Sequence, residues 1–97
     1  MQETVIITMR SRPGQLADLA ARMEYVAREA RGHDGCLTVE ILLAPDRDEL
    51  TVISHWENAD AFNAYLSWRA EQPDFGIVLN HVAEDPEIRS YQPLAAA

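Results

Sequence analysis

The segment from Gly35 to Tyr65 constrains the fold of this chain more than any other part of the sequence. It contains two apolar stretches, Cys36 to Leu43 and Leu50 to Trp56, which flank the turn sequence APDRDE. Short stretches rich in Val, Ile and aromatic residues favour strands, and a sequence rich in Pro and Asp favours a turn. Asn58 is a good N-cap for the helix that follows. We therefore predict a β-hairpin that leads directly into a helix, with Trp56 at the junction.

The sequences on both sides of this unit predict further elements. Thr4 to Met9 has the composition of a strand. Pro73 interrupts the helix after the hairpin, a second short helix follows, and Pro86 begins a last extended segment. A longer helix before the hairpin is predicted by apolar residues spaced by three and four positions, namely Leu16, Leu19, Ala20, Met23, Val26, Ala27 and Ala30. The predicted order is β-α-β-β-α-(α)-β.

This order predicts an α+β, ferredoxin-like fold. Two right-handed β-α-β crossovers give a four-stranded antiparallel sheet with helices on one face. Alternation places Leu37 and Val39 on the covered face, and Cys36 and Thr38 on the other. The uncovered face mixes Thr, Glu, His and Ile, which is too apolar to remain wet along its whole length. We therefore expect a homodimer that pairs two open sheet faces.

Composition restricts the class of protein. The 97 residues suit one domain, 1–97, in which we expect residues 93–97 to form a frayed tail. The apolar runs are too short to span a bilayer, and the first residues lack the features of a signal peptide. With a single cysteine, these features favour a cytoplasmic protein. A net charge of −8 argues against nucleic acid as a partner.

The chain offers little for metal or cofactor binding. His33, His55 and His81 have no metal-ligand spacing, and Cys36 adds none. The sequence also lacks a glycine-rich phosphate loop and a nucleophile elbow. We expect no cofactor and no metal.

Four segments together resemble the antibiotic-biosynthesis monooxygenase (ABM) domain family. These are MRSRPGQ at the exit of the first strand, the hairpin GCLTVEILLAPDRDEL, the junction HWENADAF and the closing PEIRSYQPL. The resemblance covers nearly the whole chain. It implies a dimeric α+β barrel with a pocket in each subunit, between the helices and the apolar face of the sheet. Family members include oxygenases that oxidise aromatic polyketides or quinols without metal or flavin, and haem-degrading enzymes.

The resemblance assigns site residues only in part. Trp56 matches an active-site Trp of the polyketide-oxidising members, but their Tyr falls at Phe62 and their Asn at Val52. The two His positions of the quinol-oxidising members fall at Tyr65 and near Asp74.

The haem-degrading branch matches less well. Its first-strand Asn falls near Ile7, its helix Trp at Tyr65 and its haem-ligating His at Leu79. His81 lies two residues further on, which turns it by about 200° around a helix. Haem degradation is therefore the weaker alternative.

We expect a monooxygenase that needs no cofactor and oxidises a small, electron-rich aromatic substrate with O₂. Tyr65 and Trp56 are the candidate catalytic residues. The candidate substrate-binding residues are Val52, Ser54, Phe62, Phe75, Leu79 and His81, with Asn80 as a further polar contact. Two of these residues have a structural alternative, since Trp56 can be a core anchor and Tyr65 a packed side chain. His55, on the open face, is better explained by a hydrogen-bond network at a dimer interface than by catalysis.

A second interpretation is a non-catalytic dimeric binding or accessory domain that keeps the pocket for an apolar ligand. It is favoured because Phe62 cannot exchange a proton and both family His positions are absent. Which group would accept the substrate's proton is left open by the sequence.

Overall fold

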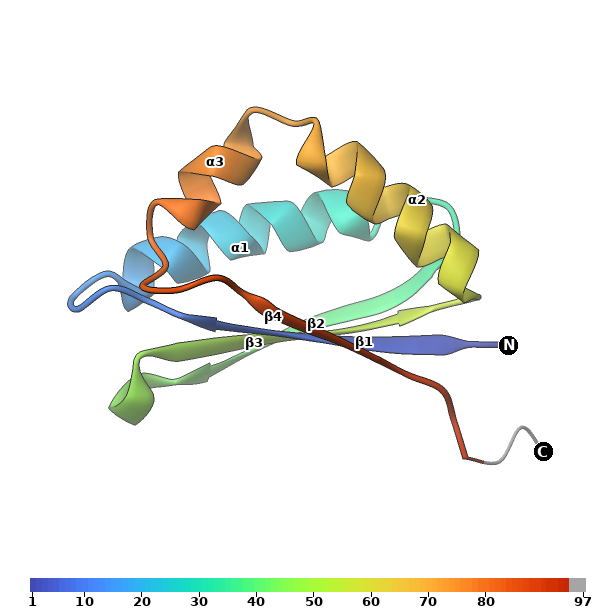
Figure 1. Ribbon diagram of the computed structural model, residues 1–97, viewed down its shortest axis with the longest axis horizontal. Helices are drawn as coiled ribbons and strands as arrows, with labels where there is room; N and C mark the ends of the chain where they lie inside the picture. Colours follow the sequence, from blue (N-terminus) through green and yellow to red (C-terminus); the bar gives the residue numbers. More distant parts are fainter. Residues whose placement is uncertain (95–97) are drawn as a thin grey trace.

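The computed structural model describes residues 1–94, and Figure 1 shows its two layers. The predicted tail 93–97 extends beyond the described residues. The strands are β1 (Glu3–Arg10), β2 (Cys36–Ala44), β3 (Glu49–Trp56) and β4 (Glu87–Tyr91), and the helices are α1 (Leu16–Ala30), α2 (Ala59–Ala70) and α3 (Asp74–Leu79). A 3₁₀ turn, Pro45–Arg47, joins β2 to β3. The predicted order of elements is confirmed. No helix within residues 1–94 has the length and apolar character needed to cross a membrane.

The strands form one antiparallel sheet in the order β2-β3-β1-β4. Helix α1 packs on β2 and β3, and all three helices lie on the same face of the sheet (Figure 1). The opposite face is uncovered in Figure 1, and on it Thr38 Oγ1 forms a hydrogen bond with His55 Nδ1 (2.8 Å). The ferredoxin-like α+β fold predicted from the sequence is therefore confirmed.

The core lies between the helices and the covered face of the sheet. Trp56, Leu19, Leu50 and Val5 are its largest fully buried side chains. They come from two strands, β1 and β3, and from helix α1, at the positions that the apolar periodicity indicates. The predicted inner face of α1 is thus correct.

One detail of β2 was predicted wrongly. Leu37 was expected on the covered face and Cys36 on the open one, but Cys36 pairs with Trp56 and packs against the core, while Leu37 is 44% exposed. The register shifts between Cys36 and Thr38, so the strand holds one extra residue at this point. Such a β-bulge reverses the alternation of side chains on its N-terminal side.

The junction of β3 and α2 is held by local backbone contacts. Asn58 Oδ1 accepts a hydrogen bond from the backbone N–H of Ala61 (2.8 Å), which confirms the predicted N-cap. The N–H of Glu57 donates to the carbonyl of Gly35 (2.8 Å), and this ties the junction to the start of β2. Gly35 has a φ of 85°, and a Cβ there would collide with Ala61. The start of α2 is therefore fixed against the hairpin.

Candidate functional site

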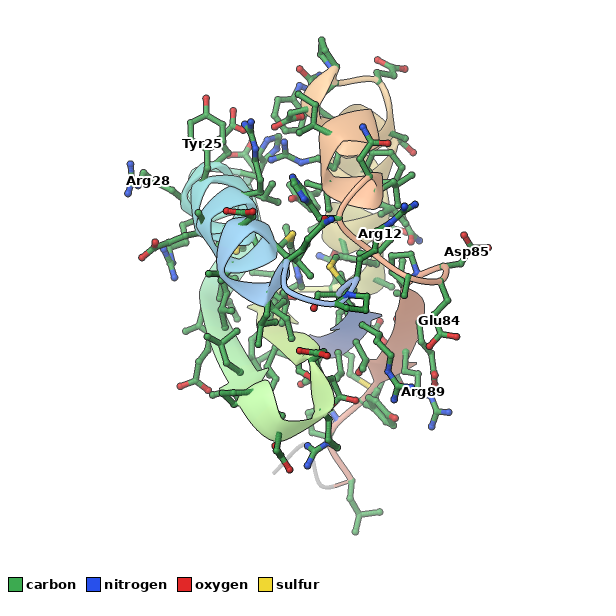
Figure 2. All side chains as sticks on the ribbon, turned by 90° about the vertical axis from the view of Figure 1, so that its left-hand side faces the viewer. Arg12, Tyr25, Arg28, Glu84, Asp85 and Arg89 are labelled. Atoms are coloured by element: carbon green, nitrogen blue, oxygen red, sulfur yellow. The ribbon has the colours of Figure 1, made fainter. Side chains whose placement is uncertain are left out.

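An apolar cavity of about 360 Å³ lies between the helices and the β1–β4 half of the sheet. Strands β1 and β4 form its floor, and side chains of α1, α2 and α3 form its walls. Its lining residues are Ile7, Met9, Met23, Val26, Tyr65, Leu66, Arg69, Phe75, Val78, Leu79, Asp85, Pro86 and Ile88. The connection between α3 and β4 forms one edge of the cavity, and Figure 2 shows Glu84 and Asp85 projecting outward from it.

Arg69 is the buried cation of this cavity. It lies on the inner face of α2 and only 4% of its surface is exposed. Its Nη1 donates to Glu29 Oε1 on α1 (3.2 Å) and to both carboxylate oxygens of Asp74 on α3 (3.1 and 3.3 Å). Its Nη2 is buried and has no hydrogen-bond partner among the described residues. One guanidinium thus joins all three helices and keeps an unused donor.

Tyr65 is bound to the same guanidinium one helical turn away. Arg69 Nε donates to the Tyr65 hydroxyl oxygen (3.2 Å), and the guanidinium also lies over the Tyr65 ring and the Trp68 ring. Burial raises the pKa of the Tyr65 hydroxyl above its ordinary value, against the opposing influence of Arg69. The hydroxyl therefore stays protonated at neutral pH, and it is a hydrogen-bond donor rather than a base.

The charge state of Arg69 follows from its partners. Burial by itself lowers the pKa of the guanidinium, but its hydrogen bonds to Tyr65 and Glu29 and the charge of Asp74 raise the pKa above its ordinary value. Arg69 is a permanent cation, and the apolar wall of the cavity carries a fixed positive group next to a neutral hydroxyl.

Trp56 lies in the core beneath Tyr65. The two rings pack with centroids 5.2 Å apart, and Phe62 contacts the Trp56 ring edge-to-face at 5.6 Å. The indole N–H donates to Ser54 Oγ (2.9 Å), inside the protein. His33 packs against the other side of the cluster, with its ring centroid 5.1 Å from that of Tyr65. These contacts fix the orientation of the Tyr65 ring.

The structure places the predicted site residues in three different locations. Tyr65, Phe75 and Leu79 line the cavity. The residues that do not line it but are buried in the core are Val52, Ser54, Trp56 and Phe62. His81 faces a different, more open hollow with Asp18, Ala21, Arg22 and Tyr25, and forms a hydrogen bond with Gln15 (3.0 Å).

Sequence reasoning did not identify Arg69 as a site residue. The available signal was its position on the same helix face as Phe62, Tyr65 and Leu66, because a charged residue on an apolar helix face needs a buried partner. The partners Glu29 and Asp74 come from other helices, and only the packing of the helices brings them together. Within residues 1–94, no group of three His, Cys, Asp or Glu side chains is arranged to hold a metal ion.

Comparisons with solved structures show the same fold in proteins of low sequence identity. Rv0793 from Mycobacterium tuberculosis has a TM-score of 0.77 at 21% identity, with 100% of this chain and 99% of that chain covered. A conserved protein from Methanosarcina mazei Go1 has a TM-score of 0.84 at 13% identity, with 95% and 92% covered. SnoaB from Streptomyces nogalater, described as a cofactor-independent oxygenase, has a TM-score of 0.79 at 18% identity, with 98% and 95% covered.

Sequence comparison gives the family. A search of curated proteins finds no match. The sequence model of the family described as antibiotic biosynthesis monooxygenase matches residues 4–70, which is more than half of the chain. The match spans β1 to the end of α2 and so includes the hairpin, Trp56, Tyr65 and Arg69. This chain belongs to the antibiotic biosynthesis monooxygenase family.

Proposed function

We propose that this protein is a monooxygenase that needs no cofactor and oxidises an electron-rich aromatic molecule, a hydroquinone or a polyketide phenol, with O₂. The observation that carries the proposal is the apolar cavity with the Tyr65–Arg69 pair as its buried polar group. Its volume of about 360 Å³ is in the range of small-molecule pockets, roughly 300–1,000 Å³. Membership of the family and the likeness to SnoaB support the same type of activity.

In the proposed reaction the ionised substrate itself reduces O₂, so the site has to bind the phenol and stabilise its anion. The apolar walls, including Phe75 and Leu79, hold the ring and exclude water. The substrate loses its phenolic proton to water, and the Tyr65 hydroxyl, which accepts a hydrogen bond from Arg69, can donate a hydrogen bond to the resulting phenolate oxygen and stabilise its charge. The phenolate then reduces O₂: the substrate gains one oxygen atom and loses two hydrogen atoms, and the second oxygen atom leaves as water.

The predicted site residues that are buried in the core act through Tyr65 in this proposal. Trp56 supports the Tyr65 ring, Ser54 and Phe62 contact Trp56, and Val52 is part of the same core. Trp56 is then a positioning residue, and Tyr65 is the residue that touches the substrate.

The proposal is tested by O₂ uptake with a panel of hydroquinones and anthrones. We expect wild-type protein to consume O₂ with at least one of them, and Tyr65→Phe to lose about a hundredfold in rate, the usual scale for one donor to a developing oxyanion. Tyr25→Phe is the matched control, because Tyr25 is exposed on α1 and does not line the cavity. Tight binding of these aromatics without any O₂ consumption would contradict an enzymatic role.

One observation favours the alternative of a non-catalytic binding domain. Asp85 is the only carboxylate among the described residues that line the cavity, it is exposed, and no histidine lines the cavity. A buried base for the substrate's proton is thus missing from the described lining. Binding without turnover in the O₂ experiment would support this alternative. Haem degradation gains no such support, because Leu79 lines the cavity where the family's ligand falls and His81 does not.

We further propose that the open face of the sheet pairs with a second copy. Ile6 and Ile53 are register partners at the centre of that face, next to the Thr38–His55 hydrogen bond. The dimeric α+β barrel that the family resemblance implies supports this proposal. We expect a dimer in sedimentation at micromolar concentration, and a monomer after Ile53→Asp because a charge would then be buried unpaired. A monomeric wild-type protein would refute this arrangement.

A further inference from the structure

The Arg69 guanidinium ends in a donor that the protein itself does not use. Nη2 is buried, and within residues 1–94 no acceptor lies within hydrogen-bond distance of it. Leaving a buried donor of a charged group unpaired is costly, so the folded protein gains if something supplies an acceptor. The same side chain lines the apolar cavity, and an oxygen atom of a bound molecule can pair with Nη2 if it displaces the side-chain atoms that cover this nitrogen.

The surroundings of Arg69 restrict the kind of acceptor. Two carboxylates, Glu29 and Asp74, already face this one guanidinium, so the cluster has more negative than positive charge. An additional carboxylate would face both of them across a short distance. To bind, this carboxylate would also have to move from water into a cavity whose other walls are almost entirely apolar. Removing a localised charge from water in this way costs free energy.

From these contacts we infer that Arg69 is the ligand-anchoring residue of the cavity, and that its free Nη2 selects aromatic molecules with an uncharged oxygen acceptor, such as a ring or aryl carbonyl, over aromatic carboxylates. The inference rests on the proposed function for the identity of the site, and it deepens that function by naming a specificity residue. Glu29 and Asp74 hold Nη1 and thereby leave Nη2 as the donor for the ligand. Tyr65 stays free to bind a second oxygen of the same molecule.

The test compares three ligands of similar shape by isothermal titration calorimetry: 2-acetylnaphthalene, 2-ethylnaphthalene and 2-naphthoate. The acetyl compound offers an uncharged acceptor, the ethyl compound offers none, and the naphthoate offers a charged one. We expect wild-type protein to bind the acetyl compound about tenfold or more tightly than the ethyl compound, as for one hydrogen bond from a charged donor. The naphthoate is expected to bind more weakly than the acetyl compound.

Variants assign this preference to Arg69. Arg69→Met keeps much of the length of the side chain without a donor, and should bind the acetyl and ethyl compounds equally well. Equal affinities in the wild type, a preference that survives in Arg69→Met, or tightest binding of the naphthoate would each overturn the inference. The wild-type ligand series decides the question even if Arg69→Met does not fold.

These ligands are not hydroquinones, so their binding does not depend on reaction with O₂. A carbonyl preference together with no O₂ uptake from any phenolic substrate would leave the anchoring role intact and refute the proposed reaction. O₂ uptake together with no carbonyl preference would support the reaction and refute the anchoring role.

Discussion

The indole N–H of Trp56 donates a hydrogen bond to Ser54 Oγ over 2.9 Å, and both side chains are buried on the covered face of β3. The two residues are two positions apart on one strand, so they point to the same side of the sheet. The hydroxyl therefore satisfies the polar atom of the largest side chain in the core.

Ser54→Ala should destabilise the fold, because it leaves the buried indole N–H without an acceptor. We expect the free energy of unfolding to fall by about 1–3 kcal/mol, measured by urea denaturation. The control is Ser54→Ala in a Trp56→Phe background, where no indole N–H is left to satisfy. A loss of the same size in both backgrounds would contradict the role of this hydrogen bond.

Gly35→Ala should destabilise the junction of β3 and α2 more than Gly14→Ala does. Both glycines have positive φ values, 85° and 77°, so both substitutions introduce backbone strain of about 1–2 kcal/mol. A Cβ at Gly14 meets nothing within 4 Å, whereas a Cβ at Gly35 collides with Ala61. The difference between the losses of thermal stability of the two variants measures the effect of the collision with Ala61. Equal losses would show that the contact with Ala61 has no effect on stability.

Asp74→Asn should weaken the fold more than Glu29→Gln does. Asp74 binds Arg69 Nη1 through both of its oxygens and its side chain is 25% exposed, while Glu29 uses one oxygen and is 35% exposed. We expect a loss of about 1 kcal/mol for Asp74→Asn and less for Glu29→Gln. Repeating both substitutions in Arg69→Met separates the ion pairs from effects at the helix ends. The reverse order would contradict this account of the cluster.

Tyr65 should ionise above its ordinary pKa of 10.0, chiefly because burial disfavours the phenolate. The difference between the ultraviolet titrations of wild type and Tyr65→Phe isolates this residue from Tyr25 and Tyr91. Because the folded pKa is raised, the contribution of Tyr65 to stability is fully present below pH 10.0 and is lost as the pH rises through the folded value. A difference titration with a midpoint below 10.0 would contradict the assigned environment.

The sequence by itself determined the elements, their order and the covered face of most of them, because these depend on local periodicity, on caps such as Asn58 and on breakers such as Pro73. It did not determine the alternation at the start of β2. A single extra residue in a strand changes which side chains face inward, and neither Cys36 nor Leu37 signals the bulge in its own composition.

Within the site, the sequence proposed Tyr65 as catalytic and Phe75 and Leu79 as substrate-binding, and all three line the cavity. The tertiary structure decided which apolar residues surround an open volume and which fill the core, since Trp56 and Phe62 have the same pattern but pack against each other. It also decided the partners of Arg69. Glu29 lies 40 residues away on α1, so only helix packing brings its carboxylate to the guanidinium, and the unused donor at Nη2 follows from that packing rather than from the residue type.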